Sequence, residues 1–558
     1  MNLNKIIPWN NTFLRFVLIL IALVILDVEV KSQQVGLIQK SAGVYDGYTL
    51  LHPQDSETTY LITNDGKVVN SWPSTSISGK AVYLLENGKL LRTLDSKDPF
   101  LGAGGAGGII ELVNWDGTAQ WRFNASEEGV YRQHHDVQYL PNGNILSLEW
   151  VPMSKEDALL NGRDPELMSE SQVDLWFERV TEYKPVGTNS VEVIWQWDLR
   201  DHLVQDFDET KLNFGSLSDN PGRFDINSNK TFGSADIIHA NSMSYNPEYD
   251  QIIISTPFLN EIWIIDHSTT TAEAQTSSGG LSNRGGDFLY RWGNPQLYNS
   301  GLPEDQQLYG QHNVKWILDN DEWKIQLFNN GLNRPEGNYS TIELLTLPFN
   351  SVEHAYEKTI GESYLPMSSS ILYIADQPTD FYSRNISGSQ RLPNGNLLIC
   401  EGQKGKFFEV NSSNEIQWIF INPKRVNNEL CLQDLQTAEA GGVFRAEKYG
   451  IDYPGIPENV LVSDINYWEV DCIVNSISDD KIMEIWPNHF NEIINISTSS
   501  PIDKIQMIDF SGKVILEQQF AEITTELTLK TDNLKTGHYI LSIHYNQGGY
   551  NYRHVLKH

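Results

Sequence analysis

The chain has 558 residues, a formal net charge of −32 and a pI near 4.7. Such an acidic chain lacks the basic surface with which DNA and RNA binders displace counterions from phosphates, so we expect no nucleic-acid partner. The charge does not exclude a small anionic substrate, because a local group of donors can bind an anion within an acidic protein. The length predicts either several domains or one large repeat architecture.

Residues 1–32 have the anatomy of a secretory signal peptide. Lys5 and Arg15 precede an apolar run over residues 16–26, and small and polar residues follow near Ser32. The run is shorter than the roughly 20 apolar residues of a typical membrane-spanning helix, and no later segment offers a longer one. We therefore expect export, cleavage of the signal and no stable membrane span afterwards; an uncleaved anchor is the alternative.

The composition and the repeats favour short strands joined by tight turns. Aromatic residues make up 11% of the chain and glycine occurs 41 times, which suits strands better than packed helices. The phrase Leu-Pro-Asn-Gly-Asn at residues 140–144 returns at 392–396, with a looser copy over 85–91. In each copy an Asn-Gly turn joins two apolar runs, which predicts a hairpin. Companion turns, each followed by a strand that contains tryptophan, begin at residues 64, 114 and 411.

These units predict an all-β fold, a roughly six-bladed β-propeller over residues 33–485. A β-helix or stacked sandwiches are the alternatives. Residues 153–232 interrupt the repeat, and we expect them to form a blade edge plus surface loops. The sequence changes character after about residue 485, where we expect a small β-sandwich domain over residues 486–558.

Histidine-bearing phrases stand at the starts of the expected inner strands. They are Gln-His-His-Asp at 133–136, His-Ala-Asn-Ser at 239–242 and Gly-Gln-His at 310–312. All inner strands of a propeller border one axial channel, so residues at equivalent starts converge. Aligned on the inner strands, His135 is level with His312, whereas His134 is level with His239. Because side chains alternate along an extended strand, we expect only one of the two to face the channel; His135 is the preferred candidate and His134 the alternative.

A metal site is an alternative for these residues, since three histidines are a known zinc arrangement, although no His-X-His pair occurs. Asp136 and Asp236 could orient an imidazole through its second nitrogen, or could serve as turn residues. The cysteines fit neither a zinc pattern nor a disulfide-rich scaffold, and Cys400 is expected to be a buried strand residue. The three cysteines are Cys400, Cys431 and Cys472.

In combination and order, four phrases resemble the bacterial aryl-sulfate sulfotransferase family over roughly residues 35–480. Besides the phrases at 239–242 and 310–312, these are Phe-Asn-Asn-Gly at 328–331 and Gly-Ser-Gln-X-Leu-Pro-Asn-Gly-Asn at 388–396. The resemblance implies a six-bladed propeller that moves a sulfuryl group from a phenolic sulfate ester to a phenolic acceptor. It also implies a sulfohistidine intermediate, no metal, no cofactor and no 3′-phosphoadenylyl sulfate.

Carried over by motif, the resemblance implies that His312 is the nucleophile. His239 and Asn241 would contact the sulfuryl oxygens, and His135 would help there or in proton transfer. The residue types suit this chemistry, because a neutral imidazole is a competent nucleophile near pH 7. Imidazole and asparagine N–H groups can also stabilise charge on the sulfuryl oxygens.

One departure from the family concerns an arginine. Members usually carry it in the strand after the His-X-Asn-Ser phrase, where this chain has Pro257, which cannot donate a hydrogen bond. Another arginine could substitute through space; the candidates are Arg284, Arg291, Arg334 and Arg384. The main alternative function is a non-catalytic cell-surface propeller for binding or adhesion, and a third possibility is a metal-assisted hydrolase or lyase.

The last residues are similar to the C-terminal sorting domains of the Bacteroidetes type IX secretion route. The similarity rests on a Gly-Lys turn at 512–513, a Leu-X-X-Gly-X-Tyr step at 534–539 and a terminal strand that ends in Lys557. It implies a protein that is secreted or held at the cell surface, with the type IX machinery as a partner and no chemistry in this domain.

Overall fold

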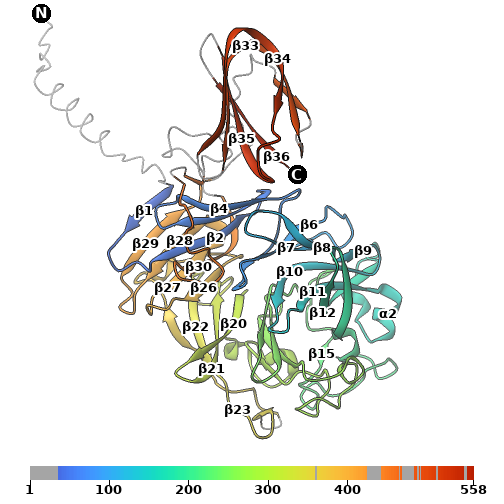
Figure 1. The fold of residues 1–558 in the computed structure, drawn as a ribbon. Coiled ribbons are helices and arrows are strands. Elements are labelled where there is room, and N and C mark those ends of the chain that lie inside the picture. Colours follow the sequence, from blue (N-terminus) through green and yellow to red (C-terminus); the bar gives the residue numbers. More distant parts are fainter. Residues whose placement is uncertain are drawn as a thin grey trace, which may run out of the picture.

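The computed structural model describes residues 35–358, 361–423, 441–463, 466–467, 483–486, 489–490, 492–509, 513–545 and 550–557. The predicted signal peptide, Cys431 and Cys472 lie outside these residues. Strands form most of the regular secondary structure of the described chain (Figure 1). None of the helices in this part of the chain is long and apolar enough to cross a membrane.

Six antiparallel sheets form the body of the molecule, and we number them around the ring as blades 1 to 6. Within each blade, the strands are given in order from the inner to the outer strand. Blade 1 consists of β30 (Val443–Gly450), β2 (Gly47–Pro53), β3 (Thr58–Thr63) and β4 (Val68–Pro73). Blade 2 consists of β5 (Ser78–Leu84), β6 (Leu90–Asp95), β7 (Gly108–Val113) and β8 (Ala119–Asn124). Blade 3 consists of β10 (Tyr131–Tyr139), β11 (Ile145–Ser154), β12 (Asp174–Val186) and β13 (Ser190–Asp198), with β9 (Ser126–Glu127) beside β10.

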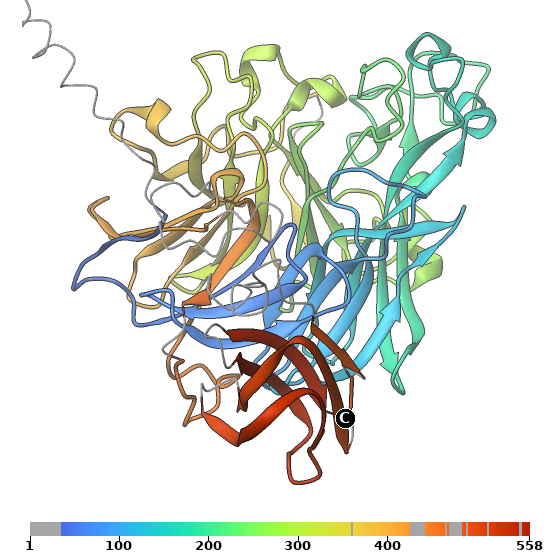
Figure 2. The ribbon, with the colours of Figure 1, turned by 90° about the horizontal axis from the view of Figure 1, so that it is seen from above.

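The other three blades follow along the chain. Blade 4 consists of β16 (Ser242–Asn246), β17 (Gln251–Thr256), β18 (Glu261–Asp266) and β19 (Tyr290–Trp292). Blade 5 consists of β20 (His312–Asp319), β21 (Glu322–Asn329), β22 (Thr341–Thr346) and β25 (Ser370–Tyr373). Blade 6 consists of β26 (Gly388–Arg391), β27 (Leu397–Glu401), β28 (Lys406–Val410) and β29 (Ile416–Ile421). Figure 2 shows the colours of the sequence running around the molecule in this order.

Both ends of the repeat region close the ring. Each inner strand lies beside the inner strand of the next blade, and β30 lies beside both β26 and β5. The C-terminal strand β30 pairs with β2, so it completes blade 1, while β1 (Gly36–Lys40) pairs with β29 at the outer edge of blade 6. The predicted six-bladed propeller is therefore confirmed, and its closure combines strands that are distant in sequence.

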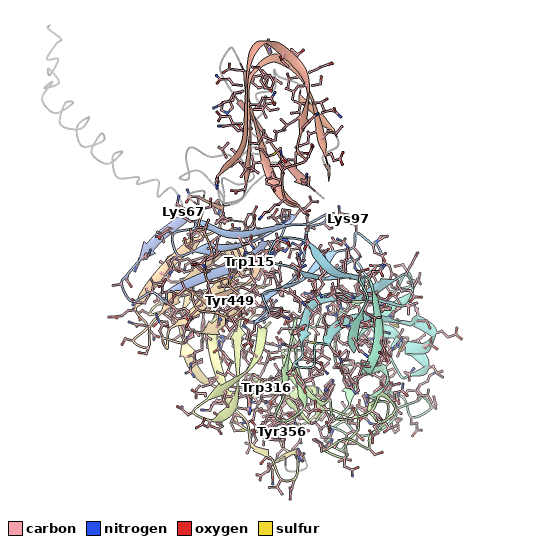
Figure 3. The ribbon with its side chains drawn as sticks, viewed as in Figure 1. Lys67, Lys97, Trp115, Trp316, Tyr356 and Tyr449 are labelled. Atoms are coloured by element: carbon pink, nitrogen blue, oxygen red, sulfur yellow. The ribbon has the colours of Figure 1, made fainter. Side chains whose placement is uncertain are left out.

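The hydrophobic core lies between the blades. Six clusters of buried residues each join two neighbouring blades, including the pair formed by blades 6 and 1. Trp115 and Tyr449 lie at the interface of blades 1 and 2 and Trp316 lies at that of blades 4 and 5; all three are labelled in Figure 3. Cys400 is buried in β27 within the cluster of blades 6 and 1, as predicted.

The two kinds of turn predicted from the repeats occupy fixed places. The Asn-Gly turns join the first and second strands of a blade, and Gly143 and Gly395 adopt φ angles of +87° and +86° there. The companion turns join the third and fourth strands. Trp72 of blade 1 donates its indole N–H to the Asn114 carbonyl of blade 2 at 3.1 Å. Trp121 and Trp418 bind the next blade in the same way.

The interruption over residues 153–232 is part blade and part loop, as expected. β12 and β13 complete blade 3, and the short helix α2 (Lys155–Leu160) lies between β11 and β12. The parallel pair β14 (Leu203–Val204) and β15 (Phe224–Asp225) lies in the long connection from blade 3 to blade 4. A second short helix, α3 (Thr271–Ala274), and the hairpin of β23 (Phe349–Asn350) and β24 (Ala355–Tyr356) belong to later loops.

A separate C-terminal sheet follows the propeller (Figure 1). The long strands β33 (Ile493–Asp509) and β34 (Val514–Lys530) pair along their length, with an irregularity between Ser497 and Ile502. β31 (Met483–Trp486) pairs with the first part of β33, and β35 (Gly537–Tyr545) pairs with the second. β36 (Tyr550–Lys557) and β32 (His489–Phe490) extend the sheet beyond β35. Buried residues from both parts of β33 share one core, as in a sandwich.

Candidate functional site

One cavity of about 540 Å³ collects a residue from the inner strand of every blade or from the segment that leads directly into it. The size suits a small-molecule site. Loops between the second and third strands of several blades complete the wall, among them Pro257 and Phe258. The six residues at the inner strands, from blade 2 round to blade 1, are Lys80, His135, His239, His312, Ile386 and Phe444.

Left-handed backbone at these strand starts aims the side chains. The φ angles of Lys80, His135, His239 and Ile386 are +94°, +50°, +58° and +40°. Bulges interrupt the pairing of β5 and of β10 at the same places. A bulge breaks the strict alternation of side chains, so alternation alone does not separate His134 from His135. His135 lines the cavity, and His134 lies behind it, fully buried and stacked on Trp150 with ring centroids 4.0 Å apart.

The ring of His312 is held by neutral partners. Its Nδ1 lies 2.9 Å from Asn330 Oδ1 and 3.0 Å from the Gly310 carbonyl oxygen. The amide nitrogen of Asn330 donates to the Ser383 carbonyl, so Asn330 turns its oxygen toward His312. Nδ1 must therefore carry the proton, which leaves the lone pair on Nε2, where the Ile386 N–H donates at 3.2 Å. Burial lowers the pKa of His312 to about 4, so the ring is neutral at pH 7.

His239 has a carboxylate partner instead. Its Nδ1 lies 2.5 Å from Asp236 Oδ2, and its ring is 4.7 Å from that of His135 between centroids. Asp236 thus orients an imidazole, one of the two roles considered from the sequence. Asp136 has other partners: its carboxylate accepts hydrogen bonds from the Tyr83 hydroxyl and from Arg445.

Asn241, which the family resemblance places at the sulfuryl oxygens, is not among the residues that line the cavity. It is fully buried, and its side-chain amide donates to the Gln311 carbonyl at 2.8 Å. The residue therefore supports the backbone immediately before His312. A sequence motif alone does not distinguish a residue that lines the cavity from one that hydrogen-bonds the backbone of the next inner strand.

Two cationic side chains line the cavity, Lys80 and Arg384. Arg384 is one of the four candidates for the missing arginine. Of the others, Arg291 is committed to a buried ion pair with Glu261 at 2.5 Å, and Arg334 lies over the rings of Tyr309 and Tyr339. The sequence analysis missed Lys80. Its signal was the place of the Ser-Gly-Lys phrase at 78–80, which starts the inner strand of blade 2.

Aromatic side chains form the apolar part of the wall. Phe258 stacks on His239 with centroids 4.4 Å apart and an interplanar angle of 8°, and half of its surface is exposed. Phe444 lies beyond His135, with ring centroids 5.7 Å apart. An aryl group can contact these rings while its charged substituent meets the cations and imidazoles.

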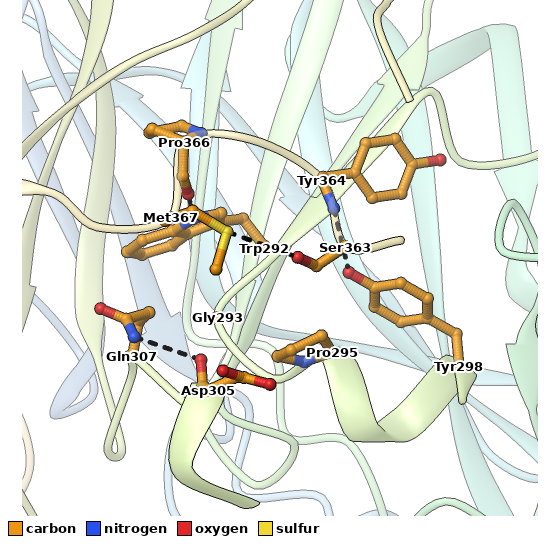
Figure 4. A pocket seen from close by; sticks show the side chains of 10 residues that line it. All are labelled: Trp292, Gly293, Pro295, Tyr298, Asp305, Gln307, Ser363, Tyr364, Pro366 and Met367. Carbon is orange, nitrogen blue, oxygen red and sulfur yellow. Dashed lines mark hydrogen bonds between the residues drawn. The ribbon is translucent and has the colours of Figure 1, made fainter. Parts of the chain in front are cut away.

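A second hollow lies beside blade 4, between Trp292, Tyr298 and the segment that contains Met367 (Figure 4). Its volume is about 10 Å³, which is room for about one water molecule. Tyr298 accepts a backbone N–H from Tyr364, and Trp292 donates to the Pro366 carbonyl. This hollow is too small for an aromatic ester.

Among the described residues, no group of three or more His, Cys, Asp and Glu side chains is arranged to hold a metal ion. In the cavity, the nitrogens of His239 and His312 that face the protein are already bonded to Asp236 and Asn330.

Residues 36–434, more than half of the chain, match the family described as arylsulfotransferase (ASST). The chain belongs to the arylsulfotransferase family. Membership implies a sulfotransferase that acts on aryl sulfates. Residues 484–557 match the secretion system C-terminal sorting domain, so this arylsulfotransferase family member is addressed to the type IX machinery and is secreted or held at the cell surface. No curated protein matches the chain.

Solved structures resemble the chain only distantly. A protein of unknown function from Bacteroides caccae is 11% identical with a TM-score of 0.36, and the match covers 72% of this chain and 98% of that one. A putative 6-phosphogluconolactonase from Bacteroides fragilis is 8% identical with a TM-score of 0.34, over 73% and 99%. Virginiamycin B lyase from Staphylococcus aureus is 10% identical with a TM-score of 0.31, over 70% and 89%.

Proposed function

We propose that this arylsulfotransferase family member moves a sulfuryl group from a phenolic sulfate ester to a phenolic acceptor through a sulfated His312. The observation that carries the proposal is the state of the His312 ring at the cavity wall. Its Nδ1 proton is held by Asn330, and the lone pair on Nε2 is available for attack once substrate replaces the bond from Ile386.

The neutral partner of His312 suits a covalent intermediate. When Nε2 bonds to sulfur, the ring becomes positive and keeps its Nδ1 proton, which Asn330 Oδ1 continues to accept. Two displacements at sulfur then replace one transfer: the donor phenolate leaves first, and the acceptor oxygen attacks second. No nucleotide donor takes part in either step.

Lys80 and Arg384 take over the task of the family arginine. By analogy with phosphoryl transfer, negative charge lies on the three sulfuryl oxygens in each transition state, and cations held in place stabilise it. Pro257 cannot do this, but both cations line the same cavity as the three histidines. Burial lowers the pKa of Lys80, whereas the neighbouring charges of Asp55 and Asp95 raise it.

The first experiment is release of 4-nitrophenol from 4-nitrophenyl sulfate by the purified protein, with and without phenol and with and without EDTA. We expect turnover that depends on the acceptor and resists the chelator. His312→Ala should lower it by about 10⁴-fold or more, because the covalent route is lost. His354→Ala is the matched control, since His354 belongs to the loop between β23 and β24 and does not line the cavity.

Other outcomes point elsewhere. Activity that EDTA abolishes would indicate the metal-assisted hydrolase or lyase. No turnover with a panel of aryl sulfates, together with saturable binding of the same esters, would favour the non-catalytic binding propeller.

A further inference from the structure

A continuous chain of polar groups runs from the cavity into the interior of blade 3. His135 Nδ1 lies 2.9 Å from His134 Nδ1, and His134 Nε2 lies 2.8 Å from Glu178 Oε2. Glu178 stands on the third strand of the blade, β12, while both histidines stand on the first, β10. We name Glu178, His134 and His135 the buried relay.

The relay is sealed from water at one end and open to the cavity at the other. Glu178 and His134 have no exposed surface, and Glu178 Oε1 accepts the Ala240 N–H at 2.8 Å. Within the described residues, Nε2 of His135 has no hydrogen-bond partner, and His135 lines the cavity. The loop at Gly105 closes over this ring, since a Cβ at Gly105 would lie 2.0 Å from His135 Nε2.

Two proton arrangements satisfy the two short distances. In the donor arrangement the carboxyl of Glu178 is protonated and donates to His134 Nε2, His134 Nδ1–H donates to His135 Nδ1, and His135 carries its proton on Nε2. In the acceptor arrangement each of these protons has moved one step away from Glu178, toward the cavity. Glu178 is then ionised and accepts from His134 Nε2–H, His135 Nδ1–H donates to His134 Nδ1, and His135 Nε2, whose proton has left, carries a lone pair. Both rings are neutral in either arrangement.

Burial favours neutral groups throughout the relay. It raises the pKa of Glu178 well above its usual range, against the Ala240 N–H, and lowers the pKa of His134 and of His135 well below theirs. Asp236 and His239 are the other titratable groups near Glu178. An ionised Glu178 carboxylate is unfavourable in free energy at this buried position. We therefore expect the ionised state to be transient.

We propose that the buried relay stores the proton that the reaction lends to one phenol and recovers from the next. The proposal rests on the sulfohistidine route. It assigns Glu178 and His134, which do not touch substrate, as positioning and proton-storing residues, and His135 as the group that exchanges the proton with the phenol oxygen.

The steps balance over one turnover. As His312 Nε2 bonds to sulfur and the ester S–O bond breaks, His135 Nε2–H protonates the leaving phenolate, and the relay passes to the acceptor arrangement. The charge of the bound ester, −1, then resides on Glu178, while the sulfated ring is a zwitterion. In the second step the acceptor O–H gives its proton to His135 Nε2, its oxygen bonds to sulfur, and the relay returns to the donor arrangement.

The test measures how the rate of single-turnover sulfation depends on the leaving group. The probes are 4-nitrophenyl sulfate, whose phenolate leaves without a proton, and unsubstituted phenyl sulfate, whose phenolate needs one. With Glu178→Gln we expect a loss of about 100-fold or more for phenyl sulfate, in the range of general acid catalysis, and little change for 4-nitrophenyl sulfate. An amide can bond His134 but cannot supply the proton.

A second variant keeps the test valid if the first does not fold. His134→Gln can still bond Glu178 and His135, but it cannot carry a proton between them, so the same selective loss is expected. The matched control is Glu182→Gln, on the same strand, because Glu182 also bonds a histidine, His267, outside the cavity. It should leave the ratio of the two rates unchanged.

Each outcome of this test either supports or overturns the buried relay. A selective loss with phenyl sulfate supports the relay. An equal loss for both esters in a protein whose wild type is active overturns the relay and leaves the sulfohistidine route standing. A wild-type protein without any sulfation overturns the route itself and the relay with it.

Discussion

The two ends of the propeller use the same residue type in opposite ways. At the cavity end, His312 faces an amide and a carbonyl, and burial lowers its pKa to about 4. At the other end, His267 follows β18 and bonds Asp250 at 2.6 Å and Glu182 at 3.1 Å. Burial also acts on His267, but the two carboxylates outweigh it and raise the pKa to about 9.

This difference shows that burial alone does not decide the charge of a histidine at pH 7: burial keeps His312 neutral beside uncharged partners, whereas two carboxylates outweigh it at His267. A positive His267 joins three blade segments by ion pairs, whereas a neutral His312 keeps a lone pair for chemistry. The other residues at the two ends of the propeller differ in the same way. Tight turns and tryptophan N–H groups bond the blades at the far end, while the cavity end leaves cations and imidazole nitrogens facing open space.

The largest effect is expected from removing the cations of the cavity end. Lys80→Met or Arg384→Met should each lower kcat by about 10-fold or more, since a hydrogen bond to a charged group is lost. The double variant should lose about 10²-fold or more, because the two side chains stand on different blades and their effects should add in free energy. The measurement is 4-nitrophenol release at saturating donor.

Arg391→Met is the control, because Arg391 pairs with Asp319 at the far end. Activity that survives in the double variant would mean that the sulfuryl charge is stabilised without Lys80 and Arg384.

An intermediate effect is expected from His267→Gln, on stability and with a pH dependence. The folded pKa of about 9 lies above the unfolded value, so the stabilisation is fully present below about pH 6.5 and is lost as the pH rises through about 9. The variant should therefore lower the free energy of unfolding by roughly 2–4 kcal/mol at pH 6 and by much less at pH 10. Denaturant unfolding at both pH values checks this.

His312→Gln should show the reverse dependence. Its folded pKa of about 4 lies below the unfolded value, so the neutral ring contributes above pH 6.5 and its contribution falls as the pH drops toward 4. Equal pH dependence in the two variants would contradict the contrast between the ends.

The smallest effect is expected from Trp72→Phe at the far end. The substitution keeps most of the buried ring and removes the N–H that bonds the Asn114 carbonyl of the next blade. We expect a loss of about 1–3 kcal/mol in the free energy of unfolding and no change in kcat, because a buried carbonyl is left without its partner. Thermal unfolding and the nitrophenol assay on the same sample give the two readings, and a loss of activity at unchanged stability would count against the separation of the ends.

Local patterns in the sequence determined much of this protein. The six blades were predicted from the Asn-Gly turns and from the strands that contain tryptophan, because both are short-range signals of β-hairpins. The C-terminal domain was predicted from the change in sequence pattern after residue 485. The equivalent places of His135, His239 and His312 predicted one site, because the symmetry of a propeller converts equal position into proximity.

Only the tertiary structure decided where each residue lies at that site. Asn241 supports the Gln311 carbonyl, and Lys80 reaches the cavity through a bulge, because bulges and left-handed residues break the alternation on which sequence reasoning depends. The partners that hydrogen-bond a histidine ring, such as Asn330 for His312 or Glu178 behind His134, come from other strands. Their contacts depend on packing between distant segments, which no local pattern encodes.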